Sequence, residues 1–195
     1  MEKYAASGNT KTAYRLLMRT PFDHVYYLVA DDASTIRLRE SSKIVPVIGD
    51  GSGWSFESED GTAGFRIRNI RFDLYLDTEL RLVNPERRRI FLSKKMECRT
   101  SQIWAWEPGR DKARLENQSL PPGDGVLEGE RISGAHLKIG KPIKGVYVTK
   151  KPKIDMMKFY QKWTKDEFKY SPDDLEKGDV PSEDHTCIYE SIIVN

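Results

Sequence analysis

Residues that could carry out catalysis or hold a metal ion are scattered through the 195-residue chain. The three histidines, His24, His136 and His185, lie far apart and lack the spacing of metal ligands. The segment 49–53 reads Gly-Asp-Gly-Ser-Gly, but no helical pattern follows it to offer amide groups to a phosphate. We therefore expect this segment to form a turn, and we expect no catalytic residues, no metal site and no cofactor.

Tryptophan residues recur at a regular interval along the chain. Trp54, Trp104 and Trp163 are about 50 to 60 residues apart, and each is followed three residues later by an acidic residue. Gln102 and Gln161 stand two residues before the second and third of them, although the chain contains only three glutamines. This pattern indicates one structural unit used three times, with a tryptophan from each unit in a shared core.

Short β-prone runs separated by turn clusters occupy the rest of the chain. The runs, which are rich in β-branched and aromatic residues, are 25–29, 44–48, 65–68, 89–92, 135–139, 145–148 and 188–194. In the third unit, the opening strand is expected near 113–116 or 125–132. Helical periodicity is limited to one or two turns at Thr12–Met18 and Asp155–Phe159. The spacing predicts an all-β barrel or sandwich.

The pattern resembles the β-trefoil of the ricin-type lectins. It has three units of four short strands, and the second and third units contain a Gln-x-Trp motif. The first unit departs from the motif, because Ser52 stands where the glutamine is expected. The resemblance covers roughly residues 22–170. It implies a β-trefoil of three four-stranded repeats that binds glycans or glycoproteins without catalysis.

The resemblance also implies one sugar site, in the second unit. Ricin-type lectins hold a saccharide with an aspartate, an aromatic ring and polar side chains close to the Gln-x-Trp motif. The matching positions are Asp77 for the carboxylate, Phe91 or Trp106 for the ring, and Ser101 and Gln102 beside the motif. A carboxylate accepts hydrogen bonds from sugar hydroxyls, and a ring packs against the C–H face of the sugar.

The other two units are expected to lack this site. They place Arg37-Leu38-Arg39 and Leu137-Lys138-Ile139 where the second unit has Asp77. A purely structural role for Asp77, fixing a turn, is an equally weighted alternative.

The predicted organisation is an N-terminal arm, a trefoil domain and a C-terminal extension. The arm covers residues 1–21, the trefoil 22–170 and the extension 171–195, which combines an acidic segment with a final strand. The repeats are expected at about 22–61, 62–110 and 111–170.

Composition favours a soluble, folded protein, with 32% charged and 10% aromatic residues. The net charge of +2 points to no particular partner. No apolar stretch has the length of a signal sequence or a membrane span. Cys98 and Cys187 lack a paired spacing and are expected to be free thiols, so we expect a cytoplasmic location.

Two other functions remain open. The same fold could serve as a protein-interaction module, such as a protease inhibitor or a subunit of a complex, through the loops 107–125 or 84–88. The segment 138–169, with ten lysines against three acids, could bind an anionic polymer. Because lysine rather than arginine dominates it and an acidic segment follows, we do not expect nucleic acid as the partner.

Overall fold

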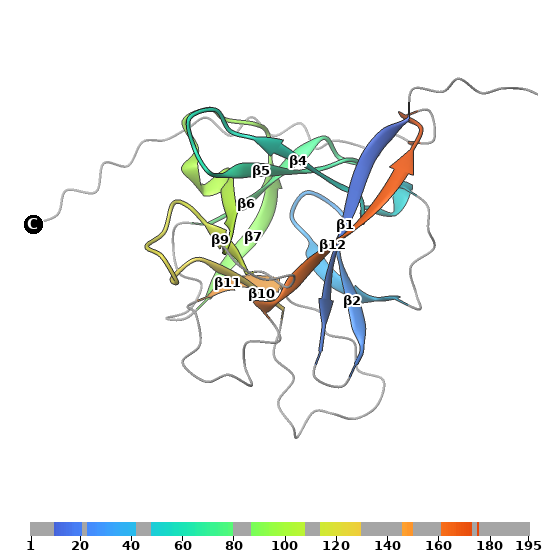
Figure 1. The fold of residues 1–195 in the computed structure, drawn as a ribbon, viewed down its shortest axis with the longest axis horizontal. Helices are drawn as coiled ribbons and strands as arrows, with labels where there is room; N and C mark the ends of the chain where they lie inside the picture. The colour runs from blue at the N-terminus through green and yellow to red at the C-terminus, as the bar shows by residue number, and fades with distance from the viewer. Residues whose placement is uncertain are drawn as a thin grey trace, which may run out of the picture.

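The computed structural model describes residues 10–20, 23–41, 48–79, 87–107, 114–129, 146–149, 161–172 and 175. These residues form β-strands and short 3-10 helices, without an α-helix (Figure 1). Within the same ranges, the chain has no helix of the length and hydrophobicity needed to cross a membrane.

Three units of four strands follow one another along the chain. The first unit contains β1 (Lys11–Arg19), β2 (Val25–Ala30), β3 (Ile36–Glu40) and β4 (Trp54–Ser58). The second contains β5 (Phe65–Asn69), β6 (Leu74–Thr78), β7 (Arg87–Ser93) and β8 (Ile103–Trp106). The third contains β9 (Leu115–Asn117), β10 (Val126–Gly129), β11 (Val146–Thr149) and β12 (Trp163–Tyr170).

The first and last strands of each unit form a barrel. Antiparallel ladders join β12 to β1, β1 to β4, β4 to β5, β5 to β8, and β8 to β9. The middle strands of each unit pair with each other as β2–β3, β6–β7 and β10–β11, and β7 also pairs with β11. This is the arrangement of a β-trefoil, so the predicted fold class is confirmed.

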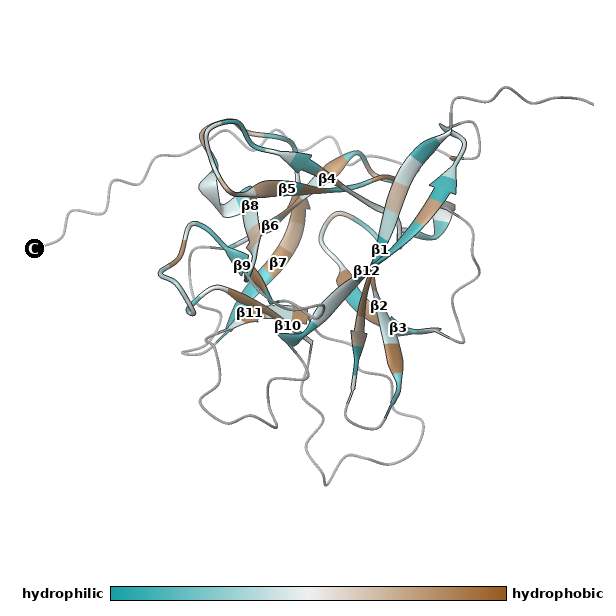
Figure 2. Cartoon of the chain, viewed as in Figure 1, coloured by the Kyte–Doolittle hydropathy of each residue, from teal (hydrophilic) through white to brown (hydrophobic). Residues whose placement is uncertain are grey.

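The recurring tryptophans form the centre of the core, as the sequence predicted. Trp54, Trp104 and Trp163 have no exposed surface, and each is the first or second residue of the last strand of its unit. Each indole Nε1–H donates a hydrogen bond to a leucine carbonyl oxygen on the second strand of the same unit. The acceptors are Leu28 (3.0 Å), Leu76 (3.0 Å) and Leu127 (2.9 Å). Buried apolar residues from the strands complete this core. The strands carry hydrophobic stretches, brown in Figure 2, beside hydrophilic ones.

Buried asparagines tie the first two units to the strands that follow them. Asn69 Nδ2 donates to the carbonyl oxygen of Gly51 (2.9 Å), and Asn117 Nδ2 donates to that of Ser101 (2.7 Å). The two asparagines are equivalent, because Asn69 pairs with Trp54 and Asn117 with Trp104. Met18 occupies the corresponding position opposite Trp163.

The predicted helical segment Thr12–Met18 is wrong, and residues 11–19 of the expected N-terminal arm form a strand. Residues 12–18 lie in β1, which pairs with β12 from Lys11 to Met18, so the first repeat begins before residue 22. The helix-like spacing has a physical cause, because β1 buries residues on both faces. Leu16 and Met18 join the main core, whereas Ala13 packs in a second cluster with Ile70.

Several other predicted elements can be compared with the structure. Segment 49–53 forms a turn as expected, and Gly51 (φ 79°) lies so close to the Ala30 carbonyl that a Cβ atom would be 1.9 Å from its oxygen. Ile48, placed in a strand by sequence, instead begins the 3-10 helix η2 (Ile48–Asp50). The third unit opens with β9, at the first of its two expected positions. Residues 44–47 of the predicted run 44–48, and the predicted segments 135–139, 155–159 and 188–194, lie outside the described residues.

Candidate functional site

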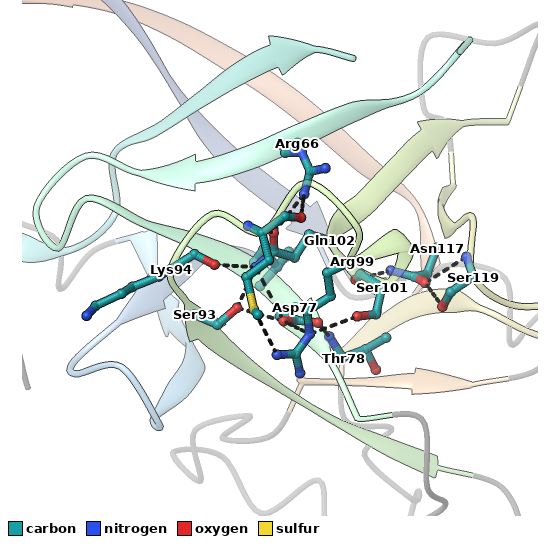
Figure 3. Close-up of polar contacts among 12 residues, drawn as sticks. Arg66, Asp77, Thr78, Ser93, Lys94, Arg99, Ser101, Gln102, Asn117 and Ser119 are labelled. Carbon is teal, nitrogen blue, oxygen red and sulfur yellow. Dashed lines mark hydrogen bonds and ion pairs between the residues drawn. The ribbon is translucent and has the colours of Figure 1, made fainter. Parts of the chain in front are cut away.

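Asp77 lies on β6 and is completely buried. Its Oδ2 accepts hydrogen bonds from Ser93 Oγ (2.6 Å) and is 2.9 Å from Nε of Arg99, with which it forms an ion pair. Its Oδ1 accepts from the backbone N–H of Thr78 (2.8 Å). The carboxylate is thus satisfied by groups of the protein itself (Figure 3).

Gln102 extends this network into the core. It ends the 3-10 helix η3 (Thr100–Gln102), and its Nε2 donates to Ser93 Oγ (2.6 Å) and to the Lys94 carbonyl oxygen (2.7 Å). Its Oε1 accepts from Nη1 of Arg66 (2.7 Å), whose side chain has no exposed surface. Gln102 therefore links the hairpin β6–β7 to the barrel strand β5.

Arg66 is neutralised by Glu59 through two hydrogen bonds. Arg66 Nε donates to Oε2 (2.7 Å) and Nη2 donates to Oε1 (2.9 Å). The hydrogen bond from Arg66 lowers the pKa of the Glu59 carboxyl, and the same pair raises the pKa of Arg66. This pair allows a guanidinium group to remain charged while its side chain is buried.

The third unit repeats the acid–glutamine network. Glu128 on β10 accepts hydrogen bonds from Gln161 Nε2 and from Thr149 Oγ1 (2.8 Å). Glu128 follows Leu127, and Asp77 follows Leu76, so the two acids are equivalent. The sequence alignment that placed Leu137–Ile139 opposite Asp77 is therefore wrong.

In the first unit, the equivalent position holds an apolar residue. Val29 follows Leu28, whose carbonyl oxygen accepts the hydrogen bond from Trp54, and Val29 is fully buried. Ser52 stands where the other units have glutamine. Arg37–Arg39, which the sequence alignment matched to the Asp77 segment, lie on β3. The first unit therefore has a valine and a serine where the other two units have an acid and a glutamine.

Four of the predicted sugar-site residues lie around Arg99, which sequence reasoning missed. Its guanidinium carbon lies 5.6 Å from the ring centroid of Phe91, and its Nε donates to Ser101 Oγ (3.3 Å). Arg99 also pairs with Asp77, which contacts Gln102 (3.5 Å). An arginine three residues before Gln102 carries no spacing signal, so only the fold could show that it covers this cluster.

Trp106, the fifth predicted residue, lies at the far end of β8 from η3 and belongs to a different site. It lines a hollow of about 530 Å³ between β8, β9 and the turn after β9. Its other lining residues are Ala63, Ala105, Glu107, Glu116, Gln118, Pro122 and Gly123. We call this the Trp106 hollow.

The Trp106 hollow combines an aromatic ring with hydrogen-bonding groups. Glu107 forms an ion pair with Arg114 (2.6 Å), whereas the Glu116 carboxylate has no hydrogen bond or ion pair with the described part of the chain. Gln118 is exposed, and Trp106 is half-buried. An indole ring, a carboxylate and an amide can together hold a polar ligand that has an apolar face.

Metal binding has no support from the ranges that the structure describes. No group of three or more histidine, cysteine, aspartate or glutamate side chains within them could hold an ion. Cys98 is exposed, and Cys187 lies outside those ranges.

No protein-family model and no curated protein matches this chain. Solved structures do resemble it. The β-trefoil BEL has a TM-score of 0.54 at 13% identity, covering 80% of this chain and 93% of its own. The lectin of Polyporus squamosus, bound to Neu5Acα2-6Galβ1-4GlcNAc, has a TM-score of 0.53 at 13% identity. The match covers 78% of this chain and 48% of the lectin chain.

A GlcNAcα1-4Gal-releasing endo-β-galactosidase from Clostridium perfringens has a TM-score of 0.54 at 15% identity. The match covers 79% of this chain, but this chain spans only 32% of the length of that protein. These likenesses establish the β-trefoil fold.

Proposed function

We propose that this protein is a non-catalytic carbohydrate-binding module and that the saccharide binds in the Trp106 hollow. The observation that carries the proposal is that the half-buried Trp106 lines one hollow with the exposed Gln118 and with Glu116, whose carboxylate has no hydrogen bond or ion pair within the described ranges. The indole can pack against the C–H face of a sugar ring. The carboxylate accepts hydrogen bonds from hydroxyl groups, and the amide both donates and accepts them.

The fold is compatible with this function but does not by itself specify it. The Polyporus squamosus lectin was solved with a glycan bound, and it shares the β-trefoil architecture of this chain. Support for carbohydrate binding therefore comes from the residues of the hollow, because they supply the aromatic and hydrogen-bonding groups that a sugar requires.

The predicted site around Asp77 is the competing location for a sugar. Its carboxylate has no exposed surface and is occupied by Ser93, Arg99 and Thr78. A sugar could reach it only after Arg99 had moved away from Phe91. The Trp106 hollow needs no such rearrangement.

Binding to a glycan array tests the proposal. Trp106→Ala removes the stacking surface, so we expect a loss of binding of about tenfold or more for every glycan that the unaltered protein binds. Glu116→Gln keeps the size of the side chain but weakens hydrogen bonding to hydroxyl groups, so we expect a smaller loss.

Phe91→Ala is the matched control, because Phe91 is the aromatic residue of the competing site. Its glycan binding is expected to equal that of the unaltered protein once folding has been checked by circular dichroism. Loss of binding in Phe91→Ala but not in Trp106→Ala would assign the sugar to the Asp77 site instead. If the unaltered protein bound no glycan on the array, carbohydrate binding would be refuted. If it hydrolysed the glycans that it binds, the non-catalytic role would be refuted.

A further inference from the structure

Lys165 breaks the threefold repetition at one end of the barrel. The residue two positions after the core tryptophan is Phe56 on β4, Trp106 on β8 and Lys165 on β12. Because alternate residues of a strand point to the same face, these side chains occupy equivalent positions. Two units supply an aromatic ring there, whereas the third supplies an ammonium group.

The Lys165 ammonium lies over a group of aromatic rings and does not extend away from the protein surface. Its Nζ is 4.9 Å from the ring centroid of Phe56, 5.0 Å from that of Tyr14 and 5.8 Å from that of Trp106. The rings also pack on one another, with centroids 5.4 Å apart for Tyr14 and Phe56 and 5.1 Å apart for Phe56 and Phe65. Cation–π attraction to several rings holds the charge at this end of the barrel.

The positive charge of Lys165 is not balanced by an acidic partner within the described residues. Lys169, farther along β12, contrasts with it because it pairs with Glu167 (3.3 Å). Aromatic rings stabilise the ammonium without neutralising it, and the Lys165 side chain is exposed. An anionic group of a ligand can therefore approach it.

Trp106 connects this charge to the hollow, because the same indole lines the hollow and lies beside the Lys165 ammonium. Glu107 and Glu116 also line the hollow, whereas Lys165 lies outside it. A ligand in the hollow would thus be near two carboxylates, and a group that extends from it past Trp106 would be near an ammonium. This polarity disfavours an anion within the hollow and favours one beside it.

We propose, on the basis of the carbohydrate-binding function above, that Lys165 makes the site selective for acidic glycans. The sugar on Trp106 is neutral, and an adjoining residue of the glycan carries a carboxylate or a sulfate that pairs with the ammonium. Sialylated or uronate-containing glycans would supply the carboxylate, and sulfated glycans would supply the sulfate.

An array that carries neutral oligosaccharides beside their sialylated, uronate-containing and sulfated counterparts tests this selectivity. The unaltered protein is expected to prefer the acidic member of at least one set. Lys165→Met keeps an unbranched apolar stem but removes the charge, so we expect it to lose about fivefold in affinity for the acidic glycan and to retain its affinity for the neutral one. Lys165→Arg is expected to restore the preference, because it restores the charge.

A structural role for Lys165 would lower binding to neutral and acidic glycans alike. Equal binding of each neutral and acidic pair by the unaltered protein, or an unchanged preference in Lys165→Met, would overturn the selectivity while leaving carbohydrate binding intact. Failure to bind any glycan would overturn both proposals. Stronger binding to the sialylated or uronate-containing glycans than to the sulfated ones would identify the anionic group as a carboxylate, and the reverse would identify it as a sulfate.

Discussion

Asp77 and Gln102 stabilise the second unit by joining its hairpin to the barrel. The sequence resemblance brought these two residues together correctly, since they contact each other in the structure. It could not show that Asp77 is enclosed, because the covering residue, Arg99, has no pattern that distinguishes it from other exposed bases. It also missed Glu128, since an acid after a leucine is recognisable only when the tryptophan hydrogen bonds align the units.

The Asp77→Ala variant is expected to destabilise the protein by about 2–4 kcal/mol. The substitution leaves the buried Ser93 hydroxyl and the Thr78 backbone N–H without their acceptor and removes the ion-pair partner of Arg99. Chemical unfolding measures the loss. The surface-pair variant Glu167→Ala is the control, with an expected change within about 1 kcal/mol. Equal stability of Asp77→Ala and Glu167→Ala would contradict the structural role of this carboxylate.

At the scale of the strand, β1 was the element that the sequence described least well. Its apolar residues are spaced as in a helix because Ala13 faces one cluster while Leu16 and Met18 face another. Periodicity detects a strand with one buried face, but a strand buried on both faces lacks the alternation. The strands of the second unit, around Phe65, Asp77 and Phe91, fit the predicted pattern and were located correctly.

Leu16→Ala is therefore expected to lower the free energy of unfolding by about 2–5 kcal/mol, as substitution of a fully buried leucine in a core does. Thermal or urea unfolding checks the value. Lys11→Ala, at the exposed start of β1, is the matched control and should change stability by less than about 0.5 kcal/mol. If both variants were equally stable, residues 11–19 would behave as an arm outside the core, as the sequence suggested.

For the molecule as a whole, the three tryptophans allowed the architecture to be predicted without any disulfide, metal or helix to guide the assignment. Their spacing gives three units, and one unit of four short strands cannot bury its own apolar face, so the units must close together. The first unit boundary was misplaced because the unit begins with the strand that resembled a helix. The Trp106 hollow was not predicted, since it depends on how the turn after β9 approaches β8.

Single substitutions of Trp54, Trp104 and Trp163 by phenylalanine are expected to lower stability by similar amounts, about 2–4 kcal/mol each. Each removes an indole donor from a buried leucine carbonyl and leaves a small void in one shared core. Each variant should still unfold in one cooperative transition, followed by fluorescence and circular dichroism together. Trp106→Phe, at a half-buried residue that packs against the edge of that core, keeps an aromatic ring there and should change stability by less than about 1 kcal/mol. Separate transitions for different units would show that the units fold independently.

The buried amide of Asn117 has a consequence for covalent modification. Asn117-Gln118-Ser119 has the sequence of an N-linked glycosylation acceptor. In the folded protein, Asn117 is only 2% exposed, and the nitrogen that would carry the glycan donates its hydrogen bond to Ser101. A glycan on this nitrogen would force β9 away from the segment before β8. Attachment of a sugar to Asn117 and formation of the native barrel therefore exclude each other, whichever compartment the chain enters.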